Sequence, residues 1–147
     1  MPAGLDVHAD AAFGARERRA IAQGTADVLR DTGGRLEVRV RYDLDMTKDL
    51  RPYLAARLLL RAPASAPIVQ IADGHGHVLG LTVDGRRAYL VTERLADDDR
   101  FARVAEHEIL HLAGLQHTDR GVMALNAGPA WTTSDEIEFE RVSGEWR

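Results

Sequence analysis

The chain contains no cysteine, and this absence narrows its chemistry at once. Disulfide bonds, thiolate ligands and a cysteine nucleophile are excluded, so any metal ion must be held by nitrogen and oxygen atoms. Aromatic residues make up only 5% of the chain, and we therefore expect a mainly aliphatic core.

Long apolar runs and dense basic runs are also missing. The longest apolar run is far too short to span a membrane, and the N-terminal residues lack the basic and apolar regions of a secretory signal. The formal charge of −4 gives no reason to expect tight binding to a phosphate backbone. We therefore expect no nucleic-acid partner and no membrane association. As the sequence stands we expect a cytoplasmic protein, and a secreted one if an N-terminal segment has been removed.

What is present is the composition of an ordinary globular protein. Apolar residues make up 45% of the 147 residues and charged residues 29%. A chain of this length can bury its own core without disulfide bonds or a partner subunit. The sequence predicts one domain over residues 1–147, acting as a monomer.

Hydrophobic periodicity and turn residues divide the chain into alternating elements. Apolar residues at helical spacing predict helices over residues 11–29 and 48–61 and a last helix over 133–142. Between them, the acids at 97–99 mark the start of a third helix in chain order, which would end at Gly114. Alternating or short continuous apolar runs predict strands over residues 36–42, 68–71, 78–82 and 88–92, the last two joined by an Asp84-Gly85 turn. A final capping-box pattern begins at Thr133.

The third of these helices carries the residues with clear chemistry. His107 and His111 are four residues apart, so both imidazoles can face one metal ion. Gly114 is placed to end the helix in a left-handed turn, which lets His117 complete a set of three nitrogen ligands. Three imidazoles leave a fourth position open, as in catalytic rather than structural zinc sites.

Glu108 follows the first histidine directly. Its carboxylate can reach a metal-bound water without occupying the metal, so its expected role is general base. Zinc lowers the pKa of such a water to about 7 and can stabilise the oxyanion formed on attack of a carbonyl. The pattern predicts a zinc-dependent endopeptidase that cleaves peptides or proteins, with one catalytic zinc ion.

The segment from His107 to His117, followed by Gly121-Val122-Met123-Ala124, resembles the metzincin metalloproteases. Their signature is HExxHxxGxxH followed by a methionine-containing turn, and the order of predicted elements is also similar, most closely to the small matrixin-like members. The resemblance implies an α+β fold. Its parts would be a mixed twisted sheet of about four strands with an antiparallel edge strand, an active-site helix, a methionine turn and a C-terminal helix.

The resemblance also implies roles for individual residues. It implies that His107, His111 and His117 bind zinc, that Glu108 is the base and that Met123 forms a hydrophobic floor. Residues of a rim strand would pair with an extended substrate, and residues after the turn would line the main specificity pocket: Gly80, Leu81 and Thr82 for the strand, and Ala124, Leu125 and Asn126 for the pocket.

The chain departs from the family pattern at three places. Only five residues separate His117 from Met123, a shorter link than in most members. Leu125 stands where some branches have a tyrosine that assists the transition state. No strong strand precedes the first helix, and Leu5–His8 would be its remnant.

Two other functions remain open from the sequence. The pattern HGxLHLxGYDH of a ribosomal-RNA maturation endoribonuclease matches Leu110, His111, Leu112 and Gly114, although this chain has Glu108 where that family has glycine. An inactive zinc-binding homologue is the other alternative. His75 and His77 could bind a second metal, but two histidines do not complete a site and a polar turn explains them.

Overall fold

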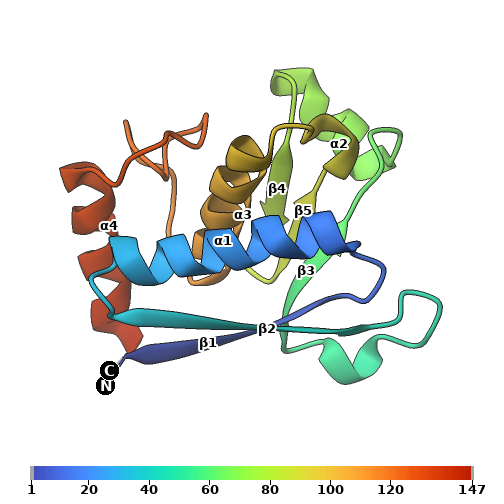
Figure 1. Ribbon diagram of the computed structural model, residues 1–147, viewed down its shortest axis with the longest axis horizontal. Coiled ribbons are helices and arrows are strands. Elements are labelled where there is room, and N and C mark those ends of the chain that lie inside the picture. The colour runs from blue at the N-terminus through green and yellow to red at the C-terminus, as the bar shows by residue number, and fades with distance from the viewer. Residues whose placement is uncertain (1, 147) are drawn as a thin grey trace.

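Five strands form one sheet in the computed structural model, which describes residues 2–146 apart from the side chain of His75 (Figure 1). The strand order is β2-β1-β3-β5-β4, in which β4 alone runs antiparallel to its neighbour. The strands are β1 (Ala3–Asp10), β2 (Leu36–Leu44), β3 (Arg57–Arg61), β4 (Gly80–Val83) and β5 (Arg87–Leu90). The α+β prediction with an antiparallel edge strand is confirmed, with five strands rather than about four.

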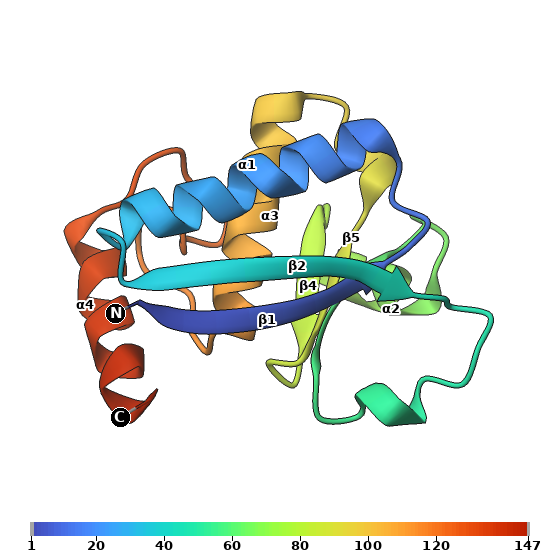
Figure 2. The same ribbon diagram turned by 60° about the horizontal axis from the view of Figure 1, so that its bottom comes forward.

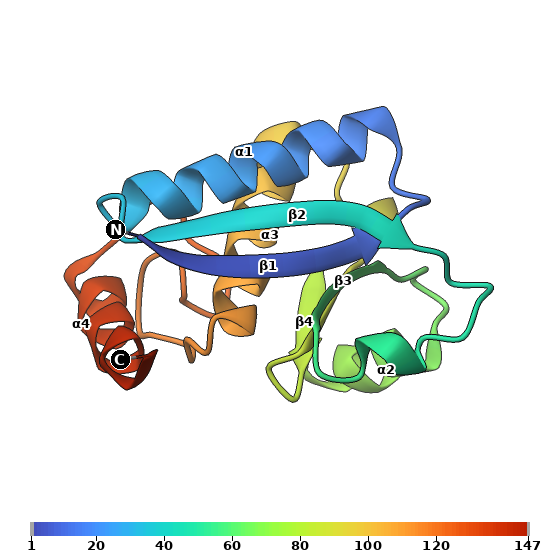
Figure 3. The ribbon, with the colours of Figure 1, turned by 90° about the horizontal axis from the view of Figure 1, so that it is seen from below.

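The two longest helices pack against each other and against the sheet. The helices are α1 (Ala15–Asp31), α2 (Pro67–Ala72), α3 (Asp98–Leu112) and α4 (Thr133–Ser143). Helix α1 contacts β2, whereas α3 contacts β4 and β5 (Figure 2). Helix α4 lies at the end of the molecule where β1 begins (Figure 3). Within residues 2–146, no helix has both the length and the apolar character needed to cross a bilayer.

The first strand is longer than the sequence indicates. Instead of a remnant at Leu5–His8, β1 is eight residues long and pairs with both β2 and β3. Val7 and Ala9 are fully buried, while Asp6 and His8 lie on the other face. Alternation over so few residues predicts a strand only weakly. The strand is stabilised mainly by its pairing with β2 on one side and β3 on the other.

The predicted helix over residues 48–61 was wrong. A single 3₁₀ turn, Arg51–Tyr53, is followed by strand β3. Its three leucines, Leu58, Leu59 and Leu60, are all at most 6% exposed because the strand lies inside the sheet. A continuous apolar run is typical of a strand buried on both faces and resembles a helix when read by periodicity alone.

The predicted strand over residues 68–71 is in fact helix α2. Pro67 occupies its first turn, where a missing N–H costs nothing. Val69 is fully buried while Ile71 is 78% exposed, so the helix buries one face only. The helices over α1, α3 and α4 and the hairpin β4–β5 agree with prediction apart from shifted ends. The last capping box uses Thr132 and Asp135 rather than Thr133 and Glu136.

Candidate metal centre

Helix α3 brings the predicted metal ligands to one surface of the molecule. It starts at a capping residue, Asp97, whose side chain accepts hydrogen bonds from the backbone N–H groups of Asp99 and Arg100. It ends before Gly114, whose φ of 106° is a left-handed conformation that side chains rarely adopt. The chain can therefore reverse directly after the helix and return His117 toward His107 and His111.

Hydrogen bonds fix the orientation of the first two imidazoles. Nδ1 of His107 donates to the backbone oxygen of Val122 at 2.7 Å, and Nδ1 of His111 donates to that of Leu115 at 2.7 Å. A carbonyl oxygen can only accept, so both rings carry their proton on Nδ1 and keep a lone pair on Nε2. Both Nε2 atoms therefore face the same point as metal ligands.

His117 joins this pair from the loop after the helix. Its ring centroid lies 5.2 Å from that of His107 and 4.7 Å from that of His111. One nitrogen from each of the three rings lies within 4.8 Å of the others. Burial lowers the pKa of all three, to about 4 for His107, so the imidazoles are neutral near pH 7 and can bind a cation.

The spacing and chemistry of these donors suit zinc. The two Nε2 atoms of His107 and His111 are 3.1 Å apart, although neither carries a proton that could join them. Two nitrogens bound to one tetrahedral zinc at about 2.05 Å would lie about 3.3 Å apart. A zinc ion held by the rings would satisfy two lone pairs that otherwise repel each other. Three neutral nitrogen ligands would leave a four-coordinate zinc able to bind water or substrate as well.

Glu108 lies beside this cluster and is almost fully buried. Its Oε1 accepts a hydrogen bond from Oγ1 of Thr82 on β4 at 3.1 Å. Burial raises the pKa of Glu108 to about 8, while this hydrogen bond acts in the opposite direction. Gly80, also on β4, leaves the room that the side chain needs, because a Cβ at position 80 would lie 2.9 Å from Cγ of Glu108.

The cluster opens into a cleft of about 790 Å³ between β4, α3 and the segment after Met123. All three histidines and Glu108 line it. Of the predicted substrate-binding residues, Gly80, Leu81, Thr82 and Leu125 also line it, as does Asn126, whereas Ala124 does not. Ala124 instead pairs with Thr118 in an isolated β-bridge. His77 is exposed at the cleft and lies outside the three-histidine group, and the side chain of His75 lies outside the described residues.

Met123 is fully buried in an apolar cluster with Ile109 and Leu110 of α3. Its segment is held by Asp135 of α4, a residue with no exposed surface. The Asp135 carboxylate accepts hydrogen bonds from the backbone N–H groups of Val122 and Met123 and from the hydroxyl of Thr118. From the sequence, Asp135 is expected only at the start of the last helix. The hydrogen bonds by which it joins α4 to the segment that contains Val122 and Met123 were not predicted.

Glu106 faces away from the cluster, toward α1. It is 2% exposed and is therefore not a solvated helix position. Burial, and next the carboxyl of Asp31 on α1, raise the pKa of Glu106 to about 10, and the side chain is therefore protonated near pH 7. Its carboxyl does not take part in the cleft.

Comparison with solved structures places this fold among known proteins. No family model and no curated protein matches the chain. The crystal structure of an archaemetzincin from Methanopyrus kandleri is similar, with a TM-score of 0.61 and 16% identity, covering 97% of this chain and 96% of the other. A zinc-dependent peptidase from Methanocorpusculum labreanum gives a TM-score of 0.54 at 18% identity, covering 92% and 99%. At these identities the likeness establishes a shared metzincin-like fold.

Proposed function

We propose that the protein is a zinc-dependent peptidase that hydrolyses peptide bonds in extended substrates. The observation that carries this proposal is the position of Glu108, a buried carboxylate beside three neutral histidines at the base of an open cleft. The two similar structures are described as an archaemetzincin and a zinc-dependent peptidase, which supports the same chemistry on this fold.

His107, His111 and His117 are the residues that hold zinc in this proposal. When bound, zinc supplies a Lewis acid that acidifies water and polarises a carbonyl group. Glu108 removes a proton from the attacking water and later returns it to the leaving amine. Thr82 fixes the Glu108 carboxylate by its hydrogen bond, and Met123 supports the site from below within the apolar cluster.

Strand β4 supplies the surface that holds the peptide. It is the last strand of the sheet, so one of its edges is free of strand partners among the described residues. An extended peptide can add to that edge through backbone hydrogen bonds, with the residue at the scissile bond near Glu108. Leu81 contributes its backbone to this edge, because its side chain packs with Val69 and Val91 on the other face of the strand. Leu125, which is 76% exposed, then contacts substrate side chains from the segment after Met123.

The test compares the zinc-loaded protein with its Glu108→Gln variant on a mixed peptide library and on structured RNA. We expect peptide cleavage by the parent and a loss of at least about a hundredfold in the variant, because general-base catalysis contributes roughly that factor. Zinc content must be equal in both proteins. Equal cleavage by the variant would show that Glu108 is not the base.

The same experiment separates the two alternatives. RNA cleavage without peptide cleavage would identify an endoribonuclease. Bound zinc without either activity would identify a zinc-binding homologue. We further propose that residues 1–147 act as one catalytic domain and as a monomer, which sedimentation of the active protein can establish.

A further inference from the structure

We infer that Arg100 is a specificity-determining residue that binds a carboxylate of the substrate at the end of the cleft nearest the N-terminus of α3. The inference deepens the proposed peptidase function and rests on it for the identity of the ligand as a peptide. Its ligand is defined by charge: an acidic side chain or the C-terminal carboxylate of the peptide.

Arg100 lies on the helix face that forms the cleft wall. Residues 100, 104 and 108 are spaced four apart, and Arg100, Val104 and Glu108 all line the cleft. Eight residues of α-helix place the Cα atoms of Arg100 and Glu108 about 12 Å apart. An extended peptide advances about 3.3 Å per residue, so Arg100 can reach a group about two to four residues from the bond next to Glu108.

Most N–H donors of the Arg100 guanidinium have no acceptor among the described residues. Its one hydrogen bond among the described residues runs from Nη1 to the backbone oxygen of Ala127, at a long 3.5 Å. No carboxylate of residues 2–146 lies within 4.0 Å of it. An arginine carries five N–H donors in a planar fork that matches a carboxylate.

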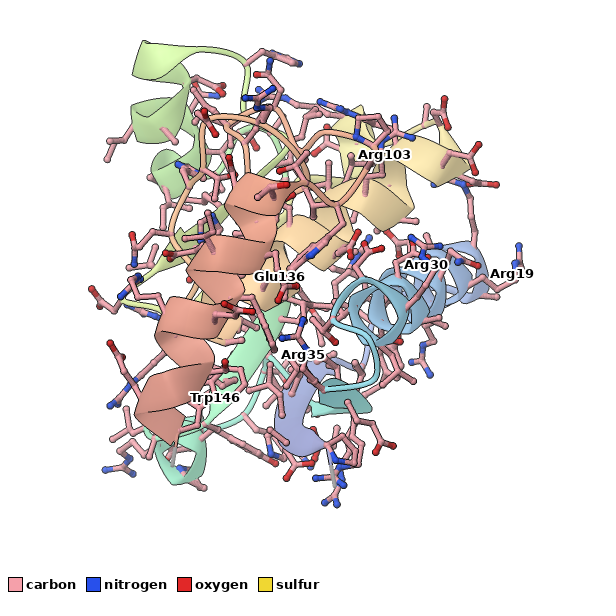
Figure 4. All side chains as sticks on the ribbon, turned by 90° about the vertical axis from the view of Figure 1, so that its left-hand side faces the viewer. Arg19, Arg30, Arg35, Arg103, Glu136 and Trp146 are labelled. Atoms are coloured by element: carbon pink, nitrogen blue, oxygen red, sulfur yellow. The ribbon has the colours of Figure 1, made fainter. Side chains whose placement is uncertain are left out.

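Two other arginines, Arg94 and Arg35, form ion pairs within the protein. Arg94 forms a two-point ion pair with Asp73, and Arg35 pairs with Glu136 on α4 at 2.6 Å, as Figure 4 shows for its labelled side chains. Arg100 is instead held beside the segment after Met123, at the wall of a half-open cleft, by its contact with Ala127. A cation held at the wall of a cleft, with free donors and no carboxylate partner among residues 2–146, is arranged for a ligand that arrives from solution.

Few acidic side chains line the cleft itself, because Asp97, Asp98 and Asp99 begin the same helix but are not among the residues that line it. Of the acids that do line it, Asp84 lies on the hairpin turn, 77% exposed at its side chain and 3.7 Å from Arg87. Glu108 is the only other acidic group that lines the cleft among the described residues, about 12 Å along the helix. Within the cleft, a substrate carboxylate beside Arg100 therefore has no acidic lining residue as a close neighbour along the helix.

The experiment uses pairs of otherwise identical peptides cleaved by the zinc-loaded protein. One pair differs by Glu or Gln at each of four positions on either side of the cleaved bond, and the other by a free or an amidated C-terminus. The variants are Arg100→Gln, Arg100→Lys and the control Arg19→Gln, which removes the same charge from the exposed outer side of α1 (Figure 4). Binding of the same peptides to zinc-loaded Glu108→Gln protein is measured by fluorescence anisotropy.

We expect the parent protein to prefer the carboxylate member of one pair, with a KM about fivefold lower than for its neutral partner. Arg100→Gln should abolish this preference and leave kcat nearly unchanged. Arg100→Lys should restore part of it, Arg19→Gln should leave it intact, and added salt should weaken it. A preference for Glu would identify a side-chain ligand, and a preference for the free acid a terminal one. The inference is overturned if Arg100→Gln affects both members of each pair equally, or if Arg19→Gln matches it.

The binding measurement separates this inference from the proposed function. Arg100-dependent preference in binding without cleavage by any zinc-loaded protein would refute the peptidase proposal and retain the carboxylate site. Cleavage without any Arg100-dependent preference in KM or in binding would retain the peptidase and refute the site.

Discussion

The side chains of Asp135 and His107 hold opposite sides of one peptide group. The backbone N–H of Met123 donates to Oδ1 of Asp135 at 3.0 Å, and the carbonyl of Val122 in the same peptide accepts from Nδ1 of His107 at 2.7 Å. A buried carboxylate on α4 thus fixes, through one peptide, the ring orientation of a metal ligand on α3.

This relationship predicts that Asp135→Asn weakens both the fold and the metal site. The amide NH₂ would face backbone N–H groups that now donate to a carboxylate, at a cost of about 1–3 kcal/mol in unfolding free energy. Loss of an outer partner of a ligating histidine typically reduces zinc affinity by about 10–100-fold. Denaturant unfolding of zinc-free protein and competitive zinc titration measure the two effects.

Glu140→Gln, an exposed change on the same helix, is the control for Asp135→Asn and should leave both quantities unchanged. Unaltered zinc affinity in a folded Asp135→Asn protein would show that the peptide link does not orient His107.

Gly80→Ala should impair cleavage while leaving zinc in place. The added Cβ would lie 2.9 Å from Cγ and 3.1 Å from Oε2 of Glu108, so the carboxylate or strand β4 has to move. We expect kcat to fall about tenfold, which corresponds to roughly 1.4 kcal/mol in the barrier. The matched control is Gly74→Ala, where a Cβ meets no atom within 4 Å. Steady-state kinetics with zinc analysis tests this, and a fully active Gly80→Ala protein would contradict it.

Asp73 anchors the segment that leads into β4. Arg94 donates from both terminal nitrogens to the Asp73 carboxylate at 2.8 Å and from Nη1 to the backbone oxygen of Val78 at 2.7 Å. The Arg94 hydrogen bonds hold the pKa of Asp73 well below its usual 3.8. Asp73→Asn should therefore speed amide exchange in residues 76–80 and raise KM for peptides.

The stability that the Asp73–Arg94 pair contributes depends on pH in a way that follows from the lowered pKa of Asp73. Because the folded-state pKa is lowered, the pair contributes stability above pH 3.8, and the contribution is lost as the pH falls below that value. The difference in unfolding free energy between the parent and Asp73→Asn should be constant from pH 5 to pH 7 and shrink toward pH 3. Asp49→Asn, which removes an exposed local pair with Arg51, should not alter exchange near β4. A difference that grows on acidification would contradict the assignment.

Removal of zinc should destabilise the whole protein. A ligand that binds only the folded state at a hundred times its Kd adds about 2.7 kcal/mol, which corresponds to roughly 5–10 °C in Tm for a chain of this size. Chelation should lower Tm by that amount, and His111→Ala should abolish the response. His77→Ala, outside the three-histidine group, should leave Tm and a stoichiometry of one zinc per chain unchanged. Two zinc ions per chain, reduced to one by His77→Ala, would show a second site.

The sequence predicts the metal-site helix well because its signals are local. Each signal depends on residues close together in the sequence: the spacing of His107 and His111, the acidic helix start and Gly114. The structure agrees with each of these predictions. The hairpin at Asp84-Gly85 is similar, since φ is positive at both positions as such a turn requires.

Features set by distant contacts could not be read in the same way. Leu58–Leu60 form a strand because β1 and β5 pair with them, and no residue nearby distinguishes that outcome from a helix. Asp135 reaches Val122 and Met123 only after the loop folds back onto α4. The sequence did not indicate a binding role for Arg100 either, because it does not distinguish an arginine in a cleft from any other exposed arginine.

The open edge of β4 can bind an extended substrate, but it can also promote aggregation. Unpaired N–H and C=O groups along a strand can pair with any extended chain, including a second copy or an unfolded neighbour. Here the exposed edge is only four residues long, ends at a tight turn and lies over a cleft lined by polar groups. The same shortness that limits aggregation also limits how much backbone pairing a substrate can obtain, so selectivity among peptides must come from side-chain contacts in the cleft.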